Sequence, residues 1–139
     1  MPPLEMALGS DGFARLLYTV VTDTKNYLLV CSNAACTSGP RYTLGMSMNM
    51  SSLDFLLPPD GNPLLLFNQS GTGYTFAARC LDEFCSSVNT NYLSTFPGSG
   101  VRAILGADGL PMIVLRLETG ADTKRQVTAI HCDDLNCLP

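Results

Sequence analysis

Apolar and polar positions alternate over short distances along the whole chain. Apolar runs of about five to eight residues are separated, about every eight to twelve residues, by clusters of Gly, Pro, Asn, Asp and Ser. No run shows the 3.6-residue period of an amphipathic helix. The pattern therefore predicts an all-β protein of short antiparallel strands joined by tight turns.

The same order of elements occurs three times. Each copy has an apolar run, an Asp-Gly turn, a second apolar run, a polar loop and a third run that ends at a cysteine. The turns lie about 48 residues apart, and a fixed period in this range is typical of repeat architectures. Asp-Gly between apolar runs predicts a hairpin, because the turn needs positive φ. The turns are Asp11-Gly12, Asp60-Gly61 and Asp108-Gly109.

The repeats divide into similar sets of predicted strands. We assign one repeat domain over 1–139, with copies at 4–48, 51–97 and 100–139. The third copy has no segment for a fourth strand. The expected strands are 4–8, 14–21, 27–31 and 42–48 in the first copy, 53–57, 63–67, 74–80 and 92–96 in the second, and 101–105, 111–117 and 126–132 in the third.

A repeat of four antiparallel strands at this period is typical of a β-propeller blade. The expected fold is therefore three blade-like sheets, of which the last lacks its fourth strand. A β-sandwich or barrel is the alternative, although neither needs the same turn chemistry in each third of the chain. Three blades leave open edges, so we expect either a homodimer that completes a six-bladed ring or further blades of a longer chain.

Two cysteines, separated by four residues, close each copy. Pairs this close in a hairpin predict local disulfides, with reduced thiols or metal ligation as alternatives. Zinc sites gather such pairs onto one ion, often with histidine, and this chain has one histidine. Disulfides would indicate a secreted, periplasmic or cell-surface location. The pairs are Cys31/Cys36, Cys80/Cys85 and Cys132/Cys137.

The third copy resembles tandem repeats of bacterial secreted and cell-surface proteins. The strings that carry this resemblance are 106–113, which reads GADGLPMI, and the later C-x4-C at 132–137. Those repeats read G-x-D-G-x-P, an apolar strand and C-x4-C, and they are generally taken to be propeller blades. The first copy departs from this pattern at Ala14 and the second at Pro58-Pro59. The resemblance implies the fold and the compartment, and no activity.

Composition narrows the class of protein further. Hydrophobic residues make up 46% and charged residues 14%, which argues against disorder. The net charge is −4 without a basic cluster, which argues against nucleic-acid binding. No apolar run approaches the roughly 20 residues that span a bilayer. The first residues show no signal-peptide pattern, so we expect such a peptide to be absent or removed.

One charged position recurs in the first strand of each copy, six residues before the turn aspartate. It is occupied by Glu5, Asp54 and Arg102. Because first strands line the channel of a propeller, we expect these residues to form a ring at its mouth that binds a small polar ligand or an ion. The alternative is that they only solvate the entrance, or that Arg102 pairs with an acid.

The loops that follow the second and fourth strands are expected on one face and differ among the copies, and variable loops on a rigid scaffold favour binding. The alternative is that these loops vary because nothing constrains them. The candidates on this loop face are Asp23, Asn26, Asn68, Glu118, Asp122 and Arg125. Asn49 and Asn68 also begin N-x-S patterns for N-glycan attachment.

Other acidic residues are interpreted as parts of turns. Calcium loops use several carboxylates, whereas each Asp-Gly turn has one, so we assign these aspartates to turn geometry. Asp133 and Asp134 beside His131 are assigned to a solvated turn rather than a metal site. We therefore expect neither a metal nor a cofactor.

These features favour a non-catalytic extracellular binding module whose ligand is a glycan, a protein or a surface polymer. A fragment of a glycosidase- or lyase-type enzyme is the first alternative, and its weakness is that the acids are scattered along the sequence. A structural spacer within a longer repeat protein is the second.

Overall fold

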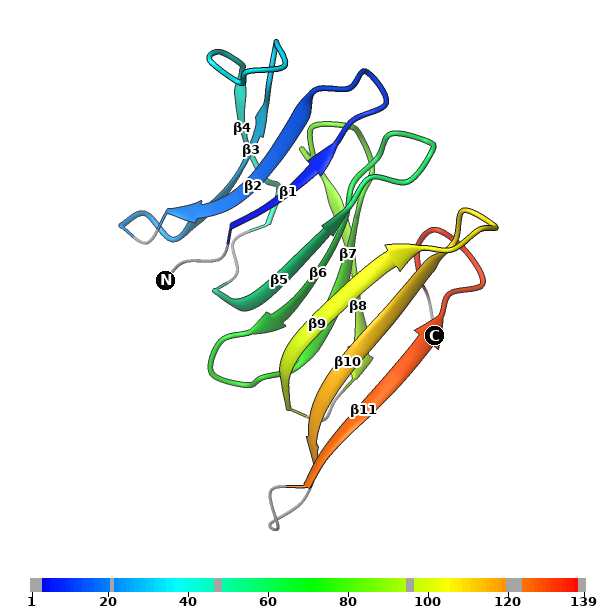
Figure 1. Ribbon diagram of the computed structural model, residues 1–139. Helices are drawn as coiled ribbons and strands as arrows, with labels where there is room; N and C mark the ends of the chain where they lie inside the picture. The colour runs from blue at the N-terminus through cyan, green and yellow to red at the C-terminus, as the bar shows by residue number, and fades with distance from the viewer. Residues whose placement is uncertain (1–3, 21, 47–48, 95–96, 120–123, 138–139) are drawn as a thin grey trace.

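The computed structural model describes residues 4–20, 22–46, 49–94, 97–119 and 124–137. Within these ranges the chain folds into three antiparallel sheets and contains no helix (Figure 1). The prediction of an all-β protein with repeated sheets is confirmed.

The first sheet contains β1 (Leu4–Leu8), β2 (Ala14–Val20), β3 (Lys25–Val30) and β4 (Arg41–Thr43). The second contains β5 (Met50–Leu56), β6 (Leu64–Gln69), β7 (Thr75–Cys80) and β8 (Val88–Ser94). The third contains β9 (Gly98–Leu105), β10 (Pro111–Thr119) and β11 (Lys124–His131).

Each sheet is a meander in which the spatial order of the strands follows the chain. Equivalent residues also pair in the same register in every copy. Met6 lies opposite Leu16 in the first sheet, and Phe55 lies opposite Leu65 in the second. The third sheet repeats this pairing with Ala103 opposite Ile113. The three segments are therefore structural copies of one unit.

Some strands begin or end away from their predicted boundaries. The strand expected at 42–48 is limited to β4, because the chain after it crosses to the second sheet, where the Gly45 N–H donates to the Cys85 carbonyl at 2.9 Å. Residues 47–48 lie outside the described part. Strand β8 starts at Val88, four residues before its predicted start, and β5 and β9 start three residues early.

The first strands of the three sheets, β1, β5 and β9, lie side by side and point the same way (Figure 1). The later strands of each sheet extend away from this row. One apolar core joins the first and second sheets and a separate core joins the second and third. The middle sheet is therefore covered on both faces.

Strand β6 shows how one run of residues serves both cores. Leu65 and Phe67 belong to the core shared with the first sheet, whereas Leu64 and Leu66 belong to the core shared with the third. All four side chains are fully buried. Because neighbouring side chains of a strand point to opposite faces, a doubly covered strand needs a continuous apolar run.

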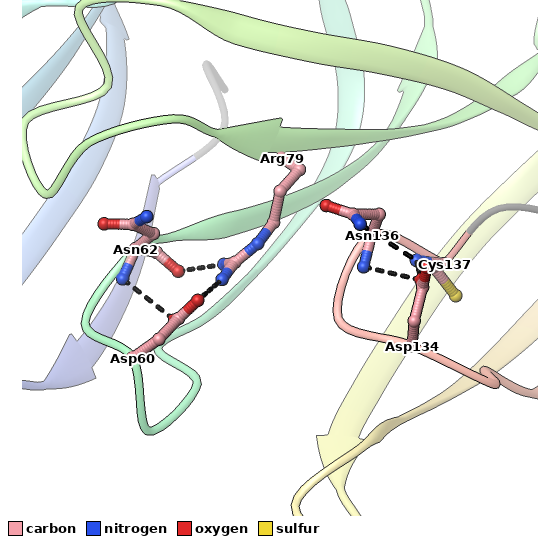
Figure 2. Close-up of polar contacts among 6 residues, drawn as sticks. All are labelled: Asp60, Asn62, Arg79, Asp134, Asn136 and Cys137. Carbon is pink, nitrogen blue, oxygen red and sulfur yellow. Dashed lines mark hydrogen bonds and ion pairs between the residues drawn. The ribbon is translucent and has the colours of Figure 1, made fainter.

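The cysteine pairs form three local disulfides, as the spacing predicted. The Cα–Cα separations are 4.9, 4.7 and 4.9 Å, within the normal range for a disulfide. The second cysteine of every pair has positive φ, between 50° and 55°. A polar residue two positions after the first cysteine stabilises the turn between the two cysteines. In the third copy, Asp134 Oδ1 accepts hydrogen bonds from the Asn136 and Cys137 amides at 2.8 Å (Figure 2).

The disulfide of the first copy differs from the other two in its surroundings, although the three spacings are identical. Cys36 is bonded to Cys31 as predicted, but it is only half-buried, whereas the other five cysteines are buried. Its counterparts Cys85 and Cys137 each belong to the core shared with the preceding sheet. Cys36 has no such core beside it in the described part of the chain. The three cysteine pairs are therefore alike in spacing and bonding but not in burial.

Candidate functional site

The three first strands bring Glu5, Asp54 and Arg102 together. Arg102 Nη1 lies 3.0 Å from Glu5 Oε1 and 3.9 Å from Asp54 Oδ1. The same nitrogen lies 3.5 Å from the Leu53 carbonyl oxygen. We call these three charged residues the charged cluster. Its members are far apart in the sequence and meet because equivalent positions of adjacent first strands are neighbours.

Exposure differs sharply among the members of the charged cluster. The Arg102 side chain is 72% exposed, whereas those of Glu5 and Asp54 are 28% and 14% exposed. Asp54 Oδ2 also accepts a hydrogen bond of 2.5 Å from the Ala103 amide in the neighbouring sheet. The hydrogen bond to Glu5, with further attraction from both carboxylates, raises the pKa of the Arg102 guanidinium above its usual value. The cluster therefore presents a permanent cation between two carboxylates.

The charged cluster places hydrogen-bond acceptors and donors within a short distance of one another. Glu5 Oε1 and Asp54 Oδ1 both contact one nitrogen of Arg102, so these oxygens cannot be more than about 7 Å apart. Carboxylate oxygens accept hydrogen bonds, and a guanidinium only donates them. A molecule that carries several hydroxyl groups can satisfy both kinds of partner at once.

A hollow lies farther along the first strands, at the end that carries the Asp-Gly turns. Its volume is about 260 Å³. Leu8, Leu57 and Leu105 line it, three residues beyond the respective members of the charged cluster, or about 10 Å along an extended strand. Its charged lining residues are Arg15 and Glu83. All three copies therefore contribute to one opening beside the row of first strands.

The turn aspartates do more than shape their turns. The Oδ1 atom of each accepts a hydrogen bond from the backbone two residues on, at 3.0 to 3.1 Å, as assigned from the sequence. The other oxygen of each binds a basic side chain, a pairing that was not predicted from the sequence. The pairs are Asp11 with Arg15 at 2.8 Å, Asp60 with Arg79, and Asp108 with His131 at 3.0 Å.

The pair in the second copy is the most buried. Figure 2 shows the Arg79 guanidinium reaching the Asp60 carboxylate and the Asn62 backbone carbonyl. Arg79 is only 4% exposed, and Asp60 is 41% exposed. Burial alone would raise the pKa of Asp60, but the hydrogen bond from Arg79 and the Asn62 amide outweigh it, so the pKa is lowered. A basic residue immediately before the first cysteine of copies two and three was the available signal.

Two residues predicted on the loop face are buried within strands instead. Asn26 lies in β3 and Asn68 in β6, and both are at most 1% exposed. Asn26 Oδ1 accepts a hydrogen bond of 2.7 Å from Thr19, and Asn68 Nδ2 donates one of 2.7 Å to Thr75. The prediction that they lie on the loop face is wrong: both amides are buried, and each makes a hydrogen bond to a threonine on the neighbouring strand that offsets part of the cost of burial.

The other loop-face candidates do not converge on one site. Asp23 Oδ2 accepts a hydrogen bond of 2.6 Å from the Tyr27 hydroxyl, which together with the Lys25 amide lowers the pKa of Asp23. Glu118 and Arg125 are exposed and face each other across β10 and β11. Asp122 lies outside the described residues.

Exposed aromatic surface is present on the outer strand of the second sheet. Tyr92 is 53% exposed, and its ring centroid lies 4.4 Å from that of Phe76 and 6.2 Å from that of Tyr74.

Within the part of the chain that the structure describes, no three His, Cys, Asp or Glu side chains are placed to hold a metal ion. Over the same ranges, no helix is long and apolar enough to cross a bilayer.

Fold and site together define an all-β protein of three repeated, disulfide-closed sheets with a charged cluster on their first strands. Comparison with family models finds no match, and neither does comparison with curated proteins. Among solved structures, the fold is similar to that of an endo-arabinase from Bacteroides thetaiotaomicron VPI-5482, with a TM-score of 0.64 and 12% identity. The similarity covers 94% of this chain and 56% of that one, so the chain spans little more than half of the enzyme's length.

Proposed function

We propose that this protein is a non-catalytic extracellular binding module of the β-propeller type and that its ligand is a neutral glycan. The observation that carries the proposal is the meeting of Glu5, Asp54 and Arg102 on three adjacent first strands. The hollow at the turn end lies about 10 Å farther along the same strands. Equivalent positions of three copies supply two acceptors and one donor to a single place.

A neutral sugar fits this charge pattern better than an anionic one. Two carboxylates and one guanidinium leave the charged cluster with a net negative charge, which repels uronic acids and phosphates. Neighbouring hydroxyl groups of a neutral sugar can donate to Glu5 and Asp54 and accept from Arg102. The solvent-exposed face of Arg102 leaves room for such a contact.

Two further observations support the proposal. The likeness in fold to an endo-arabinase makes linear arabinan a reasonable first probe. The three disulfides favour an oxidising location outside the cytoplasm, where the repeats that this chain resembles also occur.

Calorimetric titration of the disulfide-intact chain with linear arabinan, followed by an array of neutral polysaccharides, tests the proposal. Arg102→Ala should weaken binding of the saccharide at least about tenfold, the effect of losing one charge-assisted hydrogen bond. Arg41→Ala, which removes an exposed arginine outside the charged cluster, should leave the affinity unchanged. Failure of every neutral saccharide to bind, or equal affinity of the Arg102 variant, would overturn the proposal.

The second candidate function is glycoside hydrolysis, because the fold brings together two acids that are scattered in the sequence. Retaining and inverting glycosidases place their carboxylates about 5 to 9.5 Å apart, and an upper bound of about 7 Å for Glu5 and Asp54 is compatible with the lower part of this range. Release of reducing ends from arabinan, abolished in both Glu5→Gln and Asp54→Asn, would favour this function. Binding without release would favour the binding module.

A further inference from the structure

Both end sheets expose an apolar face. In the first sheet, Leu4, Met6 and Leu8 are 61%, 64% and 69% exposed. In the third sheet, the exposed set is Ile104, Met112, Val114 and Val127, with Ile104 at 64% and Val127 at 70%. A group of exposed large apolar residues on one sheet face normally marks a site of association.

Neighbouring sheets of this chain pack against each other at two junctions, between the first and second sheets and between the second and third. The two exposed faces correspond to the two sides of such a junction. We define the front face of each sheet as the side that carries Met6, Phe55 or Ala103, and the back face as the side that carries Ala7, Leu56 or Ile104; these are equivalent positions of β1, β5 and β9. Ala7 of the first back face packs in one core with Phe55 of the second front face. Leu56 of the second back face and Ala103 of the third front face likewise both pack against the other core.

The unpaired faces are therefore the front of the first sheet and the back of the third. These are the two halves of a junction that the molecule already makes twice. We propose that a second copy of this chain covers both: the back face of each third sheet packs against the front face of the other copy's first sheet. Ile104 of one copy would then meet Met6 of the other, as Ala7 meets Phe55 within the chain.

Two copies close this arrangement without leaving an apolar face. The junction is front-to-back, so a two-fold pair forms it twice and yields a ring of six sheets, within the range of four to eight that is usual for such rings. Arg102 shares the back face with Ile104, but its guanidinium turns toward Glu5 and Asp54. The charged clusters of both copies would line one channel, and the pairing does not depend on the ligand.

Light scattering coupled to size-exclusion chromatography tests the pairing. The intact chain should have twice its mass of 14.9 kDa. Met6→Glu and Ile104→Glu should each raise the dimer dissociation constant at least about 100-fold, because each buries an unpaired carboxylate in the junction. Leu81→Glu, at an exposed apolar position outside both faces, should remain dimeric. Circular dichroism of each variant checks that the monomer is still folded.

Mixing two variants distinguishes front-to-back packing from packing of like faces. Met6→Lys and Ile104→Glu alone should each be monomeric. Their equimolar mixture should recover the mass of two copies, because one junction then pairs lysine with glutamate and the other is unaltered. A monomeric intact chain, a mass above two copies, or a mixture that stays monomeric would overturn the inference.

Discussion

At the scale of the residue, each turn aspartate pairs with a basic side chain, and that side chain comes from a different strand in the first copy than in the other two. Arg15 comes from β2, whereas Arg79 and His131 come from the third strands of their sheets. The three pairs lie at equivalent turns but differ in burial, from the exposed Asp108–His131 pair to the enclosed Arg79. Their energies should differ for the same reason, because only a desolvated charge is costly to leave unpaired.

Asp60→Asn should destabilise the protein more than Asp11→Asn. The asparagine keeps the turn geometry but leaves the buried Arg79 without a counter-charge, which costs about 3 kcal/mol of unfolding free energy. The partner of Asp11 is less buried, so the matched substitution there should cost less. Urea denaturation measures both variants, and equal losses would contradict the argument.

Acid should weaken the fold through the same carboxylate. The folded-state pKa of Asp60 is lowered from 3.8, so its stabilisation is fully present above that value and is lost as the pH falls through the folded pKa. Asp82, whose pKa is lowered mainly by the Ser86 hydroxyl, contributes in the same direction. The unfolding free energy should be flat from neutral pH to about pH 5 and should fall below pH 4. In Asp60→Asn the fall should be shallower; an unchanged slope would count against this assignment.

The sequence contained the register of the charged cluster and the alternative that Arg102 pairs with an acid, which the structure shows, but not which acid it pairs with. A charge at the same place in each first strand was visible from the repeat alone. That Arg102 bridges Glu5 and Asp54 depends on how neighbouring sheets are offset, which no local pattern encodes. Asn26 and Asn68 were misplaced for a related reason: their polarity suggested solvent, and the threonines that hydrogen-bond to them lie on the neighbouring strand.

At the scale of the element, the link between the first and second sheets depends on a close approach of two backbones. A Cβ atom at Gly45 would lie 2.2 Å from the Ser86 carbonyl oxygen. The Gly45 amide at the same time bonds to Cys85, inside a disulfide hairpin that cannot easily move aside. This contact explains why β4 stops short and the chain continues as a linker.

Gly45→Ala should therefore lower the unfolding free energy by about 2 kcal/mol, as is usual for overpacking against a rigid neighbour. Gly100→Ala is the matched control, because nothing lies within 4 Å of a Cβ atom at that position. Thermal denaturation of both variants measures the difference. Equal midpoints would show that the hairpin yields at little cost.

Strand positions were largely predictable because turn residues and cysteines mark them. Strand ends were not. Strands β5 and β9 extend backward through irregular pairing near Met50 and Gly98, where the register shifts. Such bulges depend on the partner strand, and Ser and Gly carry little pattern of their own.

At the scale of the whole molecule, the middle sheet is enclosed while the outer two are each covered on one face. The repeat predicted three like sheets, and the core between each neighbouring pair follows from the apolar second strands. Closure into a ring was an expectation that rests on the same repeat. Closure could not be predicted from the sequence, because an exposed apolar sheet face can be covered equally well by a second copy or by a further sheet of the same kind.

The thermal midpoint of the intact chain should rise with protein concentration. Association stabilises the folded state by mass action, so a tenfold higher concentration favours the paired form. Ile104→Glu should unfold at a midpoint independent of concentration. Differential scanning calorimetry at several concentrations makes the comparison, and a constant midpoint for the intact chain would argue against pairing.

The turn–base pairs bear on any attempt to average the three copies into an idealised unit. Position 15 and its counterparts 64 and 112 read Arg, Leu and Met, whereas position 30 and its counterparts 79 and 131 read Val, Arg and His. Choosing at each position the residue type that most copies share would keep a basic residue immediately before the first cysteine and would remove the arginine found at position 15. An artificial array built that way would still give every turn carboxylate a basic partner, since what is inherited is a basic side chain near the bend rather than a residue at a fixed place.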